Sequence, residues 1–266
     1  MKQSMRIEPH SLRPGSQIHS VIKTVLPVLL SLAWALLLAC AASAQSMEQA
    51  DAAYAEGRFA AAAELAEKLK TSEGYALAAL SLVMHGHLST DTRVKEPLYK
   101  RAIRLAKRAI RLNPRNPEAH IQLAHAMGRY ARAIGFVKAV AGGYARKVRK
   151  AIDKALRLEP DKAGAHLSMA TWHSELVKGA GPMAGLLYGA TAKKARKHYR
   201  RSIELVPHDK VARVEYALAL LTMDKQRHHA EALHQLKHAV QDPPRNAVDR
   251  LYHKKALARL AVLNGS

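Results

Sequence analysis

Three prolines at a nearly constant spacing constrain this chain more than any other feature. Pro114, Pro160 and Pro207 are 46 and 47 residues apart, and each follows a segment in which small or apolar residues recur four and three positions apart. That spacing puts them on one face of a helix, and proline ends the helix because it cannot extend the hydrogen-bond ladder. The positions are Ala102, Ala106, Ala109 and Leu112; Val148, Ile152, Ala155 and Leu158; and Ala195, Tyr199, Ser202 and Leu205. A repeat of this length predicts an array of helical units.

The segments after the three prolines also correspond. The sixth residue after each proline is His120, His166 or Arg213, and an alanine precedes it each time. A larger residue followed by alanine comes next in each copy, at Leu123, Met169 and Tyr216. We therefore expect a second helix after each proline, with alanines that allow close helix packing. For the two histidines we predict a structural role, with one ring nitrogen bonded to backbone, and keep a shared ligand site as the alternative.

This order of helix, turn, helix and proline resembles the tetratricopeptide repeat. Residues 47–70 carry a further pair, in which Tyr54-x-x-Gly57-x-Phe59-x-x-Ala62 is similar to the turn between the two helices of that repeat. Helix resumes from Gly74 to His85, and Gly86 with Ser89–Thr92 predicts a loop before the helix that ends at Pro114.

The spacing of the prolines exceeds the usual tetratricopeptide repeat length of about 34 residues. The additional residues lie between the two helices of each pair. Gly135 and Gly181 both come 21 residues after their prolines, so the two insertions correspond. Their apolar residues are Phe136, Val137, Val140, Leu186, Leu187 and Tyr188. An apolar insertion is unlike a solvated loop, so we expect extra turns of helix or a lid over one face of the array.

Residues 48–263 resemble the regulator-of-microtubule-dynamics family of tetratricopeptide proteins. The matching segments are Ala106–Pro114 with Ala119-His120, Ala155–Pro160 with Ala165-His166, Trp172, Leu187-Tyr188-Gly189, and Ala195–Pro207. The resemblance implies a helical domain that holds a partner and carries no catalytic residue. It supplies no cofactor site.

Composition supports an all-α superhelix of antiparallel helix pairs. Apolar residues make up 48% of the 266 residues but aromatic residues only 5%, which suits alanine-rich helix packing. We expect one repeat domain over residues 45–266, with repeat helices ending near Pro114, Pro160, Pro207 and Pro243. A C-terminal capping helix is expected over residues 246–263.

The first 44 residues have the pattern of an export signal. A basic leader precedes the apolar run Val25–Leu38, and Ala42-Ser43-Ala44 offers a small-x-small cleavage site. We expect cleavage after Ala44 and a periplasmic protein. The alternatives are a lipoprotein modified at Cys40, the single cysteine of the chain, and a retained membrane anchor.

Charge indicates the kind of partner. The net charge is +22, of which residues 45–266 hold +19, and such a field attracts acidic proteins or anionic lipid surfaces. Nucleic acid is not expected because only two Phe and two Trp are available for stacking. The main basic stripes are Arg129–Arg132, Lys147–Lys150 and Lys193–Arg201, which we interpret as solvated helix faces.

The sequence offers few groups of residues that are typical of metal or ligand sites. His234 and His238 share a helix face, as metal ligands can, but the sequence contains no His-Glu-x-x-His motif, so no metal site is predicted. Trp172 is expected in the core rather than as a binding platform.

We therefore predict a non-enzymatic scaffold without cofactors that holds a protein or peptide partner in its concave groove. The repeat register places six polar residues on that face: Gln122, His125, Arg129, Ser168, Thr171 and Glu175. The alternative is a lipid-binding or membrane-docking protein of the envelope, in which the apolar insertions form a greasy pocket or a docking edge.

Overall fold

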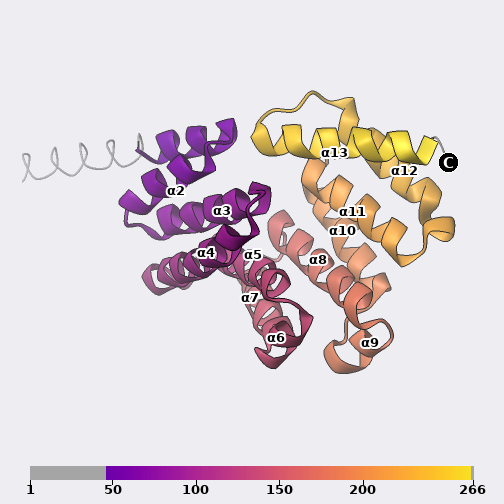
Figure 1. Cartoon of the computed structure of the whole chain (residues 1–266), viewed down its shortest axis with the longest axis horizontal. Coiled ribbons are helices and arrows are strands. Elements are labelled where there is room, and N and C mark those ends of the chain that lie inside the picture. Colours follow the sequence, from indigo (N-terminus) through magenta and orange to yellow (C-terminus); the bar gives the residue numbers. More distant parts are fainter. Residues whose placement is uncertain (1–45, 265–266) are drawn as a thin grey trace, which may run out of the picture. The chain divides into compact units, whose positions relative to one another are not determined.

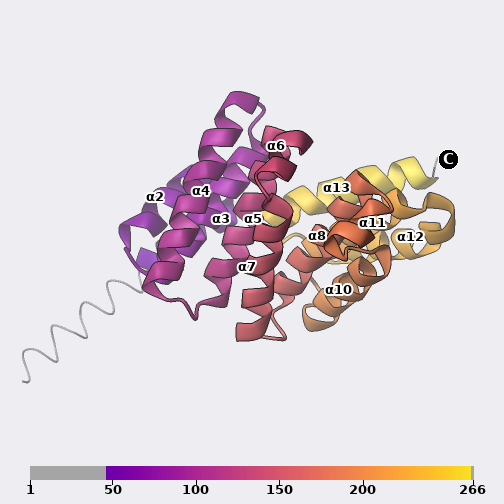
Figure 2. The same ribbon diagram turned by 90° about the horizontal axis from the view of Figure 1, so that it is seen from below.

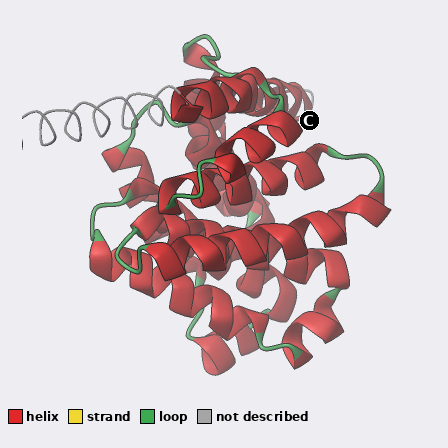
Figure 3. Ribbon diagram, turned by 90° about the vertical axis from the view of Figure 1, so that its left-hand side faces the viewer, coloured by secondary structure: helices red, strands yellow, loops and turns green. Residues whose placement is uncertain are grey.

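The computed structural model describes residues 46–264, so the expected leader, with Ala44 and Cys40, lies outside the described residues. Every regular element of the described part is a helix, as predicted (Figure 3). Residues 46–56 are helical, and they are followed by α2 (Phe59–Lys68), α3 (Ser72–Leu88), α4 (Thr92–Leu112), α5 (Pro117–Ile134), α6 (Phe136–Ala141) and α7 (Tyr144–Leu158). The chain continues with α8 (Ala163–Ala180), α9 (Met183–Tyr188), α10 (Ala192–Leu205), α11 (Lys210–Met223), α12 (Lys225–Gln241) and α13 (Ala247–Asn264).

The long helices form consecutive antiparallel pairs (Figures 1 and 2). Helix α3 packs against α4, α5 against α7, α8 against α10 and α11 against α12. The first helices of the pairs also contact one another in series, from α3 to α5, α8, α11 and finally α13. This inner row of helices is the tetratricopeptide arrangement that the proline repeat predicts.

Helix starts follow from local capping residues. Asn116 accepts hydrogen bonds from the backbone N–H groups of Glu118 and Ala119 at the start of α5. Asp209 does the same for Val211 and Ala212 at the start of α11. These side chains satisfy donors that have no partner within the helix, and this fixes where the inner helix begins after Pro114 and Pro207. After Pro160, α8 begins at Ala163 without a side-chain cap.

Alanine holds the pairs together because it allows close helix approach. Residues at the repeat positions, such as Ala102, Ala106 and Ala155, are fully buried. Gly86 shows the same effect, because a side chain there would meet the ring of Tyr99 on α4 at 2.8 Å. The predicted loop at Gly86 was therefore wrong: this glycine lies inside α3, where it permits contact with α4, and helix α4 already begins at Thr92.

The equivalent residues after the three prolines contact the proline carbonyl. His120 Nε2 lies 3.0 Å from the carbonyl oxygen of Pro114, and Arg213 Nε donates to that of Pro207 at 2.9 Å. His166 occupies the same position in the middle copy. The structural role predicted for the two histidines is confirmed by these contacts.

The two insertions form the short helices α6 and α9, which is one of the two forms predicted for them. They lie at the same edge of the array (Figure 1), and Phe136 of α6 reaches the end of α8 near Gly179. Both insertions start and end at a glycine with positive φ, which lets the chain reverse direction in few residues. These glycines are Gly135, Gly143, Gly181 and Gly189.

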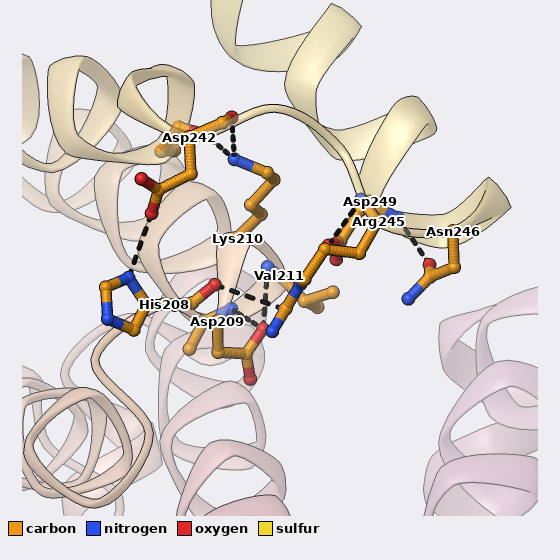
Figure 4. Close-up of polar contacts among 10 residues, drawn as sticks. His208, Asp209, Lys210, Val211, Asp242, Arg245, Asn246 and Asp249 are labelled. Carbon is orange, nitrogen blue, oxygen red and sulfur yellow. Dashed lines mark hydrogen bonds and ion pairs between the residues drawn. The ribbon is translucent and has the colours of Figure 1, made fainter.

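A buried lysine joins α11 to the C-terminal end of α12 (Figure 4). The side chain of Lys210 is 3% exposed, and its Nζ donates to the carbonyl oxygens of Ala239 at 2.8 Å and Asp242 at 2.7 Å. It thereby satisfies carbonyl groups at the end of α12 that the helix itself leaves unpaired. Nearby, Arg245 donates to Asp249 of α13 at 2.8 Å.

Helix α13 returns to the first helix of the described part. Arg250 Nη2 donates to the carbonyl oxygen of Glu56 at 3.4 Å, and Gly57 lies directly against Ala247. The last helix of the described part therefore contacts the end of the first helix and the turn that follows it. Within residues 46–264, no helix combines the length and the apolar character that crossing a bilayer requires.

Candidate functional site

A cavity of about 850 Å³ lies against the inner helices. Its lining comes from residues 46–56, from α3, α5, α8, α11 and α13, from the outer helix α7, and from both insertions. All six residues that the repeat register assigns to the concave face line it: Gln122, His125, Arg129, Ser168, Thr171 and Glu175. Their role in binding stays a prediction.

Arg129 organises the polar side chains on one wall of the cavity. Its Nη1 lies 2.8 Å from His87 Nδ1, and its Nε lies 3.4 Å from His125 Nε2. Burial, followed by the charge of Arg129, lowers the pKa of His87 to about 4 and holds that of His125 well below its ordinary value. Both histidines are therefore neutral at pH 7 and accept hydrogen bonds from Arg129.

A second cluster faces this wall from α11 and α13. Glu215 Oε1 accepts hydrogen bonds from Tyr252 at 3.0 Å and from Lys255 at 3.1 Å. Burial by itself would raise the pKa of Glu215, but Lys255, Tyr252 and Arg129 together hold it below its ordinary value. The carboxylate is therefore charged at pH 7 and offsets part of the positive charge of Lys255 and Arg129.

Gln122 presents an uncompensated hydrogen-bond acceptor. The residue is 5% exposed, and its Nε2 donates to Glu118 Oε1 at 2.6 Å. Because the amide nitrogen must face that carboxylate, the orientation of the amide is fixed. Gln122 Oε1 is then buried at the cavity without a hydrogen-bond partner among the described residues. A ligand N–H would satisfy it.

Ser168, Thr171 and Glu175 occupy the adjoining inner helix α8. Glu175 forms a salt bridge with Arg132 of α5 at 3.5 Å, and this contact links two successive inner helices. The rest of the wall is largely apolar, with Ile121, Leu167 and Trp172 among its residues. The cavity thus combines apolar walls with a few oriented polar groups, as ligand sites in proteins do.

Four residues of the two polar clusters described above were not predicted as site residues: His87, Glu215, Tyr252 and Lys255. Glu215 stands eight residues after Pro207, as Gln122 and Ser168 do after their own prolines, so extending the register to the third copy would have found it. The other three lie outside the proline register, and the sequence carried no signal for them.

The remaining sequence candidates are placed elsewhere. The rings of His234 and His238 have centroids 4.4 Å apart, and the described residues contain no group of three side chains suited to a metal ion. Trp172 is buried as expected, with its Nε1 donating to the carbonyl of Ala145 at 2.8 Å, yet its surface also lines the cavity. The solvated face expected for Arg129–Arg132 was wrong for Arg129, because this side chain lies inside the cavity.

One of two similar solved structures has the same fold over most of the chain. A thermophilic tetratricopeptide protein of Thermus thermophilus, TTC0263, superposes with a TM-score of 0.59 at 20% identity and covers 81% of this chain and 99% of its own. A human IFIT1 dimer with m7Gppp-AAAA gives a TM-score of 0.42 at 16% identity, with 81% of this chain and 59% of that chain covered. No curated protein sequence matches the chain.

A family model decides the relationship. The model described as regulator of microtubule dynamics protein 1-3 matches residues 46–264, which is the whole described part of the chain. The match includes every helix that lines the cavity. The chain is therefore a member of the regulator of microtubule dynamics protein 1-3 family, with a tetratricopeptide-like fold.

Proposed function

We propose that this protein is a non-enzymatic scaffold that holds a segment of a partner protein in the cavity of its inner helices. The observation that carries the proposal is the unpaired Gln122 Oε1 in a largely apolar cavity that Arg129 of the same helix also lines. Helical repeats of this type typically bind proteins along their inner helices.

The polar groups suit an extended polypeptide. A backbone N–H can donate to Gln122 Oε1, and a backbone carbonyl or a carboxylate can accept from Arg129, whose Nη1 and Nε are held by His87 and His125. Apolar side chains of the partner would pack against residues such as Ile121 and Leu167. Oriented polar groups of this kind give specificity, and the apolar contacts give affinity.

The partner is proposed to be acidic and the protein to act in the periplasm or cell envelope. The +19 net charge of residues 45–266 favours encounter with an acidic surface. The location rests on the export pattern of residues 1–44, with modification at Cys40 as the alternative form of the mature protein.

Peptide selection tests this proposal and needs no named partner. A random-peptide phage library is panned on the purified protein, and the selected peptides are measured by fluorescence polarisation. We expect acidic peptides to be enriched and to bind about tenfold or more weakly to the Arg129→Met variant, because a hydrogen bond to a charged group is worth about 1.5–3 kcal/mol. Lys107→Met, on the exposed outer face of α4, is the matched control and should bind as the wild type does. Failure to select any peptide, or equal binding to all three proteins, would contradict the proposal.

A second candidate is a lipid in the same cavity. Phe136 and Val140 of α6 and Tyr188 of α9 line it, so the insertions extend its apolar wall toward one edge of the array. Solvent extraction of the purified protein followed by mass spectrometry separates the two candidates. A stoichiometric lipid that excludes the selected peptides favours the lipid, whereas a lipid-free protein that binds them favours the scaffold.

A further inference from the structure

The outer sides of the two insertions form an exposed apolar edge. Its members are Phe136 (63% exposed), Val137 (79%), Val140 (48%), Met183 (48%), Leu186 (79%) and Leu187 (53%). We call these six residues the insertion edge. Both insertions project from the same edge of the array (Figure 1), and each carries three of these exposed apolar side chains. Large apolar side chains concentrated at such exposure mark an interaction surface.

The sequence around the insertion edge is basic throughout. Residues 133–152 contain five Lys and Arg, residues 176–200 contain six, and neither range contains an Asp or Glu. Leu187 and Tyr188 share a pocket of about 310 Å³ with Arg146, Lys150 and Arg157, which brings these cations directly beside the edge. Within the described residues, none of these three cations forms a salt bridge. Asp153, the one carboxylate of this pocket, is already paired with Arg149 at 2.9 Å.

We propose that the insertion edge docks this protein on the surface of an anionic lipid bilayer. The apolar tips enter the boundary between headgroups and acyl chains, while Arg146 and Lys150 contact lipid phosphates. Apolar burial combined with attraction to anionic lipids is the general basis of peripheral membrane binding. Val137, Met183, Leu186 and Leu187 of the insertion edge do not line the cavity, so these four residues can contact a bilayer whatever the cavity holds.

Charge favours a bilayer over a second copy of this chain. Two insertion edges facing each other would bring two fields of the same sign together, and like charges across an interface oppose association. An anionic bilayer supplies the opposite sign over the whole width of the edge and needs no shape complementarity to six protruding side chains.

Position-specific fluorescence tests the docking. The full chain carrying Cys40→Ser receives one cysteine, labelled with an environment-sensitive dye, at Val137 or Leu186. Matched controls carry the label at Leu112 (54% exposed) on α4 or Leu257 (49% exposed) on α13. The residues before position 46 are the same in all four proteins, so any response that they cause is common to all.

We expect the labels at Val137 and Leu186 to shift to the blue on vesicles of phosphatidylcholine with phosphatidylglycerol, while the labels at Leu112 and Leu257 stay unchanged. Phosphatidylcholine vesicles alone should give a much weaker response. The double variant Arg146→Gln, Lys150→Gln should reduce vesicle partitioning about 25-fold, at about fivefold for each cation near the surface. The control pair Lys107→Gln, Arg111→Gln, on the exposed face of α4, should partition as the parent does.

Three results would overturn the proposal. One is the absence of any response at Val137 and Leu186. Another is an equal response at all four positions, which would mean that another part of the chain holds the protein on the membrane. The third is a shift at Val137 and Leu186 that needs no vesicles and grows with protein concentration, which would assign the edge to contact between copies.

Discussion

His166 Nε2 lies 2.9 Å from the carbonyl oxygen of Pro160, six residues earlier in the chain. Its other ring nitrogen, Nδ1, lies 2.9 Å from Nδ1 of His198 on the outer helix α10. If His166 Nε2 donates to the carbonyl, its Nδ1 is an acceptor, and His198 donates to it. The ring of His198 also stacks on His173, at 5.9 Å between centroids. These three neutral rings join the inner helix α8 to the outer helix α10.

Stability should therefore fall in mild acid. Burial, followed by the neighbouring histidine and nearby cations, lowers the pKa of His173 and His198 to about 4, from the usual 6.5. Between these values the unfolded chain binds more protons than the folded chain, so the free energy of unfolding falls as the pH falls from about 6.5 toward 4. Urea denaturation at a series of pH values should show this decrease.

The His198→Gln variant should have a shallower dependence on pH than the wild type, because one of the titrating rings is gone. Some dependence remains through His87, whose pKa is also about 4. The control His234→Gln alters an exposed side chain on α12 and should keep the wild-type slope. Equal slopes for the wild type and His198→Gln would show that this cluster does not couple protonation to folding.

The contact between α13 and the turn after residues 46–56 depends on Gly57. Its φ is +93°, and a Cβ there would lie 2.9 Å from Cβ of Ala247 on α13. Gly57→Ala should therefore lower the free energy of unfolding by about 1–3 kcal/mol. Gly128→Ala is the matched control: it lies within α5 with no atom within 4 Å of the added carbon and should stabilise by about 0.5–1 kcal/mol. Chemical denaturation measures both, and the same sign for the two variants would disprove the role given to Gly57.

Lys210 should contribute more to the free energy of unfolding than any exposed lysine does. Replacing it with methionine keeps the aliphatic stem but removes the donor to the carbonyls of Ala239 and Asp242. We expect Lys210→Met to lower the free energy of unfolding by about 1.5–3 kcal/mol. The exposed Lys237 on α12 provides the comparison, and Lys237→Met should change stability little. A small effect at both positions would mean that the buried ammonium group is not needed.

A single intact-mass measurement shows how the N-terminus is processed. Cleavage after Ala44 predicts a mature protein that begins at Gln45 and contains no cysteine. Intact-mass measurement of the protein purified from an exporting host checks this. A diacylglyceryl adduct on Cys40 would support the lipoprotein alternative, and an uncleaved chain would support the anchor.

Repetition explains why much of this fold was predictable. The proline register defines the inner helices α5, α8 and α11 and the outer helices before them, since each copy carries the same helical pattern and the same closing proline. The same register assigned six side chains to the concave face, because residues at equal distances from the prolines occupy equivalent helix positions. It also contained Glu215, although the third copy was not used in this way.

Long-range closure explains what the sequence did not reveal. Tyr252 and Lys255 reach the cavity because α13 returns to the first helix, and the Arg250–Glu56 contact joins residues 194 positions apart. No local pattern encodes such a return. Gly86 was misread for a related reason, since its meaning depends on Tyr99 of the next helix rather than on its own neighbours. From the sequence alone, Arg129 is interpreted as part of a basic stripe, because its contacts with His87 and His125 form only in the folded chain.

Photo-crosslinking tests the central claim, that the inner helices hold a polypeptide segment, most directly. Benzoylphenylalanine replaces Thr171, which lines the cavity, or Lys107, which lies on the exposed outer face of α4. The labelled proteins are irradiated with the tightest peptide from the phage selection. We predict an adduct from position 171 that excess unlabelled peptide suppresses, and none from position 107. Adducts from position 107 alone, or equal adducts from both positions, would contradict binding in the cavity.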